Sequence, residues 1–195
     1  MAIDFKTCIK LASGNIRTPR CRLSYPRLFT AFPDDKGTLF FTSSILIYPD
    51  CDISLLKTEG AEAVKAEWGA SVTNVKTPFL DAVAKGNPVP AGTVLIRTKS
   101  KQKPGVLDAR GQNVNDESEV YPGRWCFVTL RPYTWTNDKG GKGLSFGLQN
   151  VQLLEHDEQL GGGRAAAETE FEPVAVAEGT APAAGGSGSA SDLFA

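Results

Sequence analysis

Two alternating runs of residues on either side of a glycine-rich turn constrain the fold of this chain more than any other feature. Both runs lie within residues 124–154, and the turn covers residues 137–143. Because side chains alternate between the two faces of a strand, Cys126, Val128 and Leu130 share one face, which suits a hydrophobic core. The pattern predicts a long β-hairpin.

The opposite face of the first run carries an arginine and four aromatic rings. Its large members are Trp125, Phe127, Arg131, Tyr133 and Trp135. Flat rings beside a cation are typical of a surface that stacks the bases of single-stranded nucleic acid. We expect Arg131, Tyr133 and Trp135 to act in this way. Packing in the core is the alternative for the other two rings, and Pro132 marks either a bulge or an edge that reverses the alternation.

The remaining chain up to residue 154 predicts further strands and one helix. Strands are expected at residues 5–11, 16–25, 38–48 and 93–99, and a small hairpin at residues 106–114. Asp52 or Ser54 begins a helix that ends near Trp68, which we interpret as a packing residue. Several short strands with one inserted helix predict an all-β Greek-key barrel of five or more strands.

Positive residues are concentrated in two of the expected strand regions. They are Arg20 and Arg22 in the first, and Arg97, Lys99, Lys101 and Lys103 in the second. Within each set the residues share one strand parity, and no acidic residue lies between them. Alternate residues on a strand are about 6.7 Å apart, close to one phosphate step in an extended single strand. We therefore expect these cations to follow a nucleic-acid backbone. A lysine-rich strand edge that prevents aggregation is the alternative.

Charge divides the chain into a basic body and an acidic end. Residues 1–154 hold 20 Lys or Arg against 14 Asp or Glu, whereas residues 155–195 hold one Arg against eight acids. This division suggests a polyanionic ligand and an internal acidic competitor, although an acidic end can also serve solubility alone.

The composition of the chain after residue 160 changes to Ala, Glu, Pro, Gly and Ser. Such a segment cannot bury enough apolar surface to fold, so we expect a domain at residues 1–160 and a disordered acidic tail at residues 161–195. Asp192, Leu193 and Phe194 stand near its end, and we interpret them as a peptide that docks on a partner.

Cysteine and histidine usage argues against a metal site or a cofactor. The four cysteines form no CxxC pair, and His156 is the single histidine. This leaves neither a zinc-ligand spacing nor a Cys–His catalytic pair. Scattered thiols without a signal peptide indicate a reducing cytoplasm. No apolar run reaches the roughly 20 residues of a transmembrane helix, so no membrane partner is expected.

A nucleotide-processing enzyme or a nuclease is the alternative function. It would use a cluster of carboxylates to hold a metal ion or to act as an acid and a base. Close acidic residues occur at Asp50 and Asp52, and at Asp116, Glu117 and Glu119. Both groups fall in turn-like segments, where ordinary solvated turns explain them better. We therefore expect a binding protein without catalytic residues.

The sequence resembles the single-stranded-DNA-binding proteins of tailed phages and prophages over about residues 16–163. The matching blocks are residues 22–29 (Arg-Leu-Ser-Tyr-Pro-Arg-Leu-Phe), 41–49, 98–108, 118–123 (Ser-Glu-Val-Tyr-Pro-Gly) and 142–152. The resemblance implies an OB fold with an acidic C-terminal tail, and sequence-nonspecific binding of single-stranded DNA during phage replication and recombination in the host cytoplasm.

The resemblance also implies partners. Acidic tails of this kind dock on replication proteins such as a polymerase, a helicase or a primase. In this chain the tail departs from the pattern, because only Asp192 is acidic near the end and Ala195 follows Phe194. The oligomeric state stays open, with a homodimer as one option.

Overall fold

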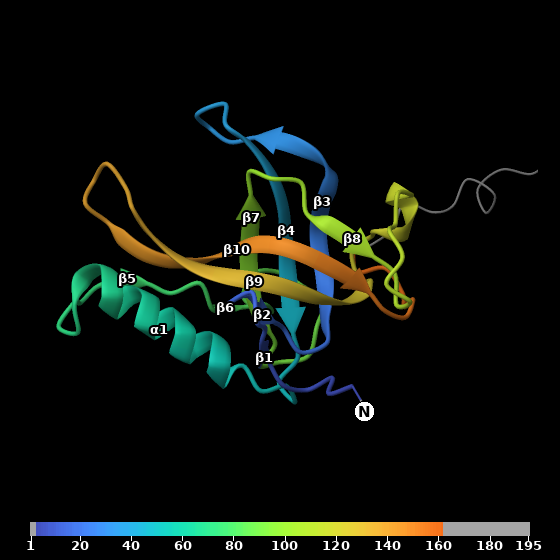
Figure 1. Cartoon of the computed structure of the whole chain (residues 1–195), viewed down its shortest axis with the longest axis horizontal. Helices are drawn as coiled ribbons and strands as arrows, with labels where there is room; N and C mark the ends of the chain where they lie inside the picture. Colours follow the sequence, from blue (N-terminus) through green and yellow to red (C-terminus); the bar gives the residue numbers. More distant parts are fainter. Residues whose placement is uncertain (1–2, 162–195) are drawn as a thin grey trace, which may run out of the picture. The chain divides into compact units, whose positions relative to one another are not determined.

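The computed structural model describes residues 3–161, in which strands dominate and one α-helix is inserted (Figure 1). The strands are β1 (Ile9–Lys10), β2 (Ile16–Arg17), β3 (Cys21–Pro33), β4 (Leu39–Ile47), β5 (Val75–Lys76), β6 (Leu80–Asp81), β7 (Val94–Ser100), β8 (Gly105–Leu107), β9 (Trp125–Thr136) and β10 (Lys142–Leu153). The helices are α1 (Ser54–Trp68) and the 3-10 helix η1 (Glu117–Glu119). Beyond Gly161, the predicted tail lies outside the described residues.

The five long strands close into a barrel. β3 pairs with β4, β4 with β7, β7 with β10, β10 with β9, and β9 again with β3. The pairing of β7 with β10 is parallel and the other four are antiparallel. This ring is a five-stranded Greek-key barrel, and the predicted all-β class with one inserted helix is confirmed.

The inward face of the β9–β10 hairpin supplies much of the core. Cys126, Val128 and Leu130 of β9 are fully buried, and so are Phe146 and Leu148 of β10. Burial of apolar surface stabilises the fold by about 25 cal/mol per Å² removed from water. The predicted alternation along residues 124–136 is therefore confirmed for its core face.

The other face of β9 begins with two covered rings. Phe127 is only 3% exposed, because Phe5 stacks on it with the ring centroids 5.5 Å apart and the Arg17 guanidinium lies 4.2 Å from its centre. Trp125 is half-buried. Phe127 is thus a packing residue, the alternative that the sequence left open. The bulge of the hairpin lies between Leu148 and Asn150 of β10 rather than at Pro132.

Helix α1 packs against the β9–β10 hairpin, and a glycine permits its close approach. Leu56 and Gly60 are its buried residues, and a Cβ at Gly60 would lie 2.6 Å from Leu144 Cδ2 of β10. The glycine that weakens the helix in isolation therefore makes room for the hairpin. Before the helix, the Asp52 carboxylate accepts a 2.8 Å hydrogen bond from the Ser54 N–H. No described helix is long and apolar enough to cross a membrane.

Strand lengths near the N-terminus differ from the prediction. The strand expected at residues 5–11 is reduced to β1, whereas β3 continues to Pro33 instead of ending near residue 25. Its pairing with β4 shifts register between Ser24 and Arg27 and again between Arg27 and Phe32. These irregularities let one strand continue past Pro26, which has no N–H to donate to the sheet.

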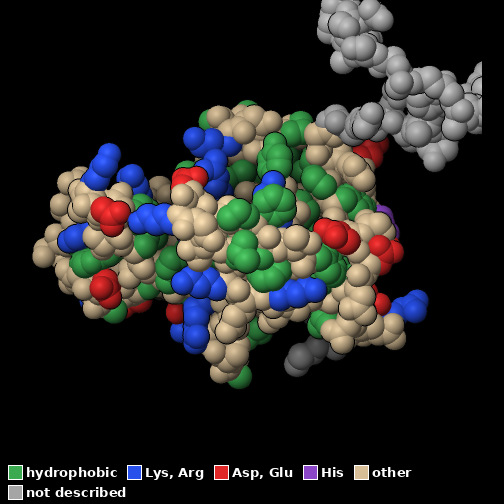
Figure 2. All heavy atoms as spheres, turned by 90° about the horizontal axis from the view of Figure 1, so that it is seen from above, with side chains coloured by type: hydrophobic (Ala, Val, Ile, Leu, Met, Phe, Trp, Pro, Cys, Tyr) green, Lys and Arg blue, Asp and Glu red, His purple; other side chains and the backbone are tan. Residues whose placement is uncertain are grey.

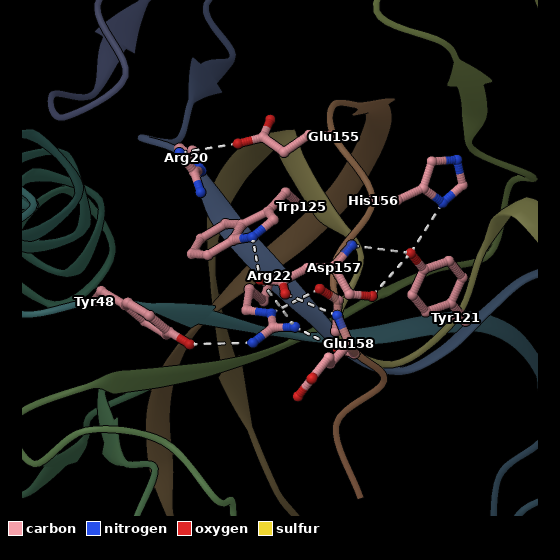
Figure 3. Close-up of polar contacts among 10 residues, drawn as sticks. Arg20, Arg22, Tyr48, Tyr121, Trp125, Glu155, His156, Asp157 and Glu158 are labelled. Atoms are coloured by element: carbon pink, nitrogen blue, oxygen red, sulfur yellow. Dashed lines mark hydrogen bonds and ion pairs between the residues drawn. The ribbon is translucent and has the colours of Figure 1, made fainter. Parts of the chain in front are cut away.

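After β10 the chain turns back as residues 155–161, which we call the strap (Figure 3). Arg22 of β3 anchors it: Arg22 is 7% exposed, and its Nε donates a 2.7 Å hydrogen bond to the Gly123 carbonyl. Its terminal nitrogen donates to the Glu158 carbonyl and lies 3.4 Å from the Asp157 carboxylate. Because a buried guanidinium needs such acceptors, Arg22 joins the strap to the barrel.

The strap passes so close to Gly123 that a side chain there has no room. A Cβ on Gly123 would lie 2.5 Å from the Glu158 carbonyl oxygen and 2.8 Å from the Leu160 nitrogen, and its φ is +103°. Gly111 also has a positive φ, +79°, but nothing lies within 4 Å of its Cβ position. An alanine at Gly111 would suffer backbone strain only, whereas an alanine at Gly123 would suffer backbone strain and a clash with the strap.

We expect Gly123→Ala to lower the free energy of unfolding by about 1–3 kcal/mol more than Gly111→Ala, because only the first adds a clash with the backbone. Urea unfolding followed by tryptophan fluorescence measures both. Equal losses in the two variants would show that the strap is not held against Gly123.

Candidate nucleic-acid interface

The predicted basic stripe is exposed, but only half of it lies on a strand. Arg97 and Lys99 point outward from β7, whereas Lys101 and Lys103 follow the end of that strand, before β8. All four side chains are exposed, and among the described residues none of them forms an ion pair with an acid. Their charge is therefore available to a ligand.

Strand register places this stripe beside Arg131 and Tyr133, the residues of β9 that we expect to contact nucleic acid. Lys99 pairs with Thr42 of β4 on one side and with Gly147 of β10 on the other, and Gly147 pairs with Arg131 of β9. These four residues form one row across the outer face of the barrel. Two positions along, Arg97 pairs with Ser44, and Ser145 with Tyr133. The fold thus brings the β7 cations and the β9 residues onto one surface.

A groove of about 350 Å³ runs along this surface. It is lined by Tyr25, Thr42, Ser44, Arg97, Lys99 and Ser145, with the backbone between them. The floor consists of short hydroxyl side chains, whereas the margins carry a ring and two cations. We call the hollow lined by these residues the groove. Figure 2 looks down on the molecule from above and shows Lys and Arg side chains beside apolar side chains on one face.

Tyr25 is the most prominent residue that sequence reasoning missed. It is 78% exposed and has a φ of +47°, where the register of β3 shifts. A non-glycine residue in the left-handed region costs on the order of 1 kcal/mol or more, and such strain is often kept at functional sites. Its signal in the sequence is a tyrosine between Ser24 and Pro26, next to Arg27.

The β3–β4 hairpin adds rings that sequence reasoning did not assign to the site. Each ring lies under a cation: Phe32 under Arg27 at 3.7 Å, Phe40 under Lys99 at 4.5 Å, and Phe29 under Lys103 at 5.2 Å. Phe32 is 46% exposed. The basic stripe and the hairpin rings therefore form one mixed surface, the combination that single strands bind.

The β9 residues have different surroundings. The Trp135 ring lies on Gly143, where it leaves no room for a Cβ, and Lys76 Nζ is 5.9 Å from its centre. Trp135 and Tyr133 are half-buried, so each still presents surface to solvent. Arg131 is exposed, but its guanidinium is 3.6 Å from the Cβ position of Gly14, in the turn before β2. It therefore points toward that turn.

Arg20 and Arg22 do not form the expected exposed face. The prediction is wrong for Arg22, which is buried and anchors the strap. Arg20 lies 3.8 Å from the centre of the Trp125 ring and forms a 2.9 Å ion pair with Glu155 of the strap. Strand parity is misleading here, because Glu155 and Asp157 of the strap neutralise the charges of Arg20 and Arg22. These acids are more than 130 residues away in the sequence, so the local pattern around residues 20–22 does not reveal them.

Two of the acidic residues considered for catalysis accept hydrogen bonds from the backbone, and Asp50 and Glu119 form ion pairs with Lys6 and Arg124. Asp116 accepts a 2.9 Å hydrogen bond from the Ser118 N–H, and such bonds from Ser118 lower the pKa of Asp116. Bonds from Ser54 lower the pKa of Asp52 in the same way. Within residues 3–161, no group of three His, Cys, Asp or Glu side chains is arranged to hold a metal ion.

Sequence and structure comparisons point to one family. The sequence model described as "Enterobacter phage Enc34, ssDNA-binding protein" matches residues 14–181. The chain is 25% identical over 177 residues to the "Putative protein p50" of Acyrthosiphon pisum secondary endosymbiont phage 1, which covers 84% of this chain and 95% of that protein.

Two solved structures share the fold. The single-stranded DNA-binding protein from bacteriophage Enc34 in complex with ssDNA has a TM-score of 0.70 and 22% identity, over 81% of this chain and 96% of that one. Its C-terminal truncation has a TM-score of 0.66 and 23% identity, over 81% and 95%. The family match covers most of the chain, and the shared fold agrees with the barrel described above. This chain belongs to the family of the Enterobacter phage Enc34 single-stranded-DNA-binding protein.

Proposed function

We propose that this protein binds single-stranded DNA through the groove, without sequence preference. The observation that carries the proposal is the row of unpaired cations, among the described residues, beside exposed rings on one face of the barrel. Membership of the family supports it, as does the fold shared with a protein solved in complex with ssDNA.

Each part of the surface has a distinct task in this proposal. Arg97, Lys99, Lys101 and Lys103 bind phosphates, because no acid competes for them within the described residues. Tyr25, Tyr133 and Trp135 stack bases. Stacking is open to every base, since each has a flat face, so the rings discriminate little between sequences. A duplex hides its base faces and therefore cannot use these rings.

Within this proposal the protein acts in phage DNA replication and recombination inside the host cell, and it is not an enzyme. The acidic tail, residues 161–195, competes with DNA for the body and carries the docking peptide Asp192, Leu193 and Phe194 to replication proteins. The support is its charge: residues 161–195 hold five acids against one arginine. The docking residues lie outside the described part of the chain.

Removing two cations of the stripe should weaken binding to all sequences alike. We expect Lys99→Ala with Lys101→Ala to reduce the slope of log affinity against log salt by about 0.7 for each phosphate that the protein no longer neutralises. Lys57→Ala with Lys65→Ala removes the same charge from exposed positions of α1 and serves as the matched control. Fluorescence anisotropy with mixed-sequence oligonucleotides gives both slopes. An identical slope for the two double variants would exclude the stripe from the site.

Tyr25 should separate binding from stability. We expect Tyr25→Ala and Tyr25→Gly to weaken single-strand binding by about 1–3 kcal/mol, because the ring no longer stacks on a base, while Tyr25→Phe binds almost as well as the native chain. Tyr25→Gly should be at least as stable as Tyr25→Ala, because glycine tolerates the positive φ. Anisotropy titration and urea unfolding measure the two properties. If both small substitutions left the affinity unchanged, the exposed ring would have no part in binding.

Neutralising the tail should strengthen binding at low salt. Glu168, Glu170, Glu172 and Glu178 each become Gln in one full-length variant, which removes four competing charges. We expect tighter binding than that of the native chain at low salt, and equal affinities as salt rises, because screening weakens both interactions. Equal affinities at low salt would mean that the tail serves solubility only.

A further inference from the structure

An apolar trough lies on the outer face of the barrel, away from the groove residues. Its volume is about 530 Å³, against about 350 Å³ for the groove. Phe127 and Val151 are buried beneath it, and Leu11 and Leu107 are half-buried at its margins. None of its lining residues is acidic, and none lines the groove. The trough is therefore a separate surface suited to apolar side chains.

Arg17 places a positive charge at the margin of the trough. Its guanidinium lies over the Phe127 ring and donates one 2.8 Å hydrogen bond to the Asp4 carbonyl. Among the described residues it forms no ion pair with an acid. A hydrogen bond from a guanidinium to a carboxylate is stronger than one to a neutral acceptor. A ligand with apolar side chains next to a carboxylate would therefore fit both the trough and Arg17.

Residues 192–194 have that chemistry. Leu193 and Phe194 directly follow the Asp192 carboxylate. From Gly161, where the described part ends, 32 residues lead to Leu193. At up to ~3.3–3.6 Å per residue they span at most about 110 Å, whereas a body of this size is about 40 Å across. The end can therefore reach a neighbouring copy.

We propose that the trough binds residues 192–195 of a second copy of this chain. Leu193 and Phe194 fill the apolar space, and a carboxylate pairs with Arg17. The proposal rests on the single-strand binding proposed above, which holds neighbouring copies side by side. A tethered end then meets the neighbour's trough at a high effective concentration, so even a weak interaction links the copies. Coating of a long strand becomes cooperative, although the groove is unchanged.

A peptide titration without DNA tests the trough itself. The receptor is the full chain carrying Leu193→Ala and Phe194→Ala, so that its own end cannot compete, and the probe is a fluorescent peptide of residues 186–195. We expect binding that falls at least about tenfold with Leu107→Glu or Leu11→Glu added. Val83→Glu, at an exposed apolar position outside the trough, should have no effect. No binding, or binding unaffected by both trough variants, overturns the proposal.

A complementation experiment tests the second copy. One chain carries Leu107→Glu and keeps its end, and the other carries Leu193→Ala with Phe194→Ala and keeps its trough. On long single-stranded DNA, analysed by sedimentation or electron microscopy, each alone should bind without clustering, and an equimolar mixture should recover clusters. If the native chain does not cluster, or the mixture does not recover clusters, the end does not link copies and the proposal fails.

A binding assay with an oligonucleotide that has room for only one protein molecule tests the proposed single-strand binding independently of the trough. We expect all these variants to bind this oligonucleotide with native affinity, because none alters the groove. If even the native chain failed to bind it, the proposed single-strand binding would be wrong, while the peptide titration would still decide whether the trough accepts the C-terminal end.

Discussion

The closure of the barrel by β10 is the constraint on which the remaining structure depends. One edge of β10 pairs with β9 along nearly its whole length, and the other edge pairs in turn with β5, β7 and β8. Closure removes the free edges where the five strands meet, although β3 pairs with β9 only at Cys21 and Arg22. It also sorts side chains strictly, because every residue of a barrel strand points either into the core or outward. The functional surface can therefore be made from outward positions alone.

This sorting explains why much of the fold follows from the sequence. Cys126, Val128 and Leu130 alternate with outward residues, and the barrel buries them as predicted. The helix and the basic side chains of Arg97 and Lys99 also lie where local pattern places them. Period-two alternation and the polar residues before a helix are local properties, so they can be recognised within a few residues, although the N-cap position is Ile53 rather than Asp52 or Ser54. Strand lengths are less predictable, as β3 shows, because bulges depend on pairing with a distant strand.

The candidate site was only partly predictable for the same reason. The sequence identifies cations and rings, but not which of them a distant segment will cover. Arg22 and Phe127 have the right chemistry and parity, yet the strap and Phe5 remove them from the surface. Tyr25 follows four buried residues of β3 and stands where the register shifts, with a positive φ that the sequence does not signal. Tertiary packing and backbone geometry, rather than residue type, decided these three cases.

The strap has an electrical consequence for the whole body. Its acids, together with Glu119, lie beside Arg20, Arg22 and Arg124, so positive and negative charge cancel locally there. The cations of β7 and the turn after it have no such counterions among residues 3–161. The grooved face therefore keeps the charge of these four cations, whereas the strap neutralises arginines elsewhere on the barrel. Under the proposed function, this leaves the grooved face as a surface that attracts a polyanion from a distance, so the strap contributes to the rate of encounter without lining the groove.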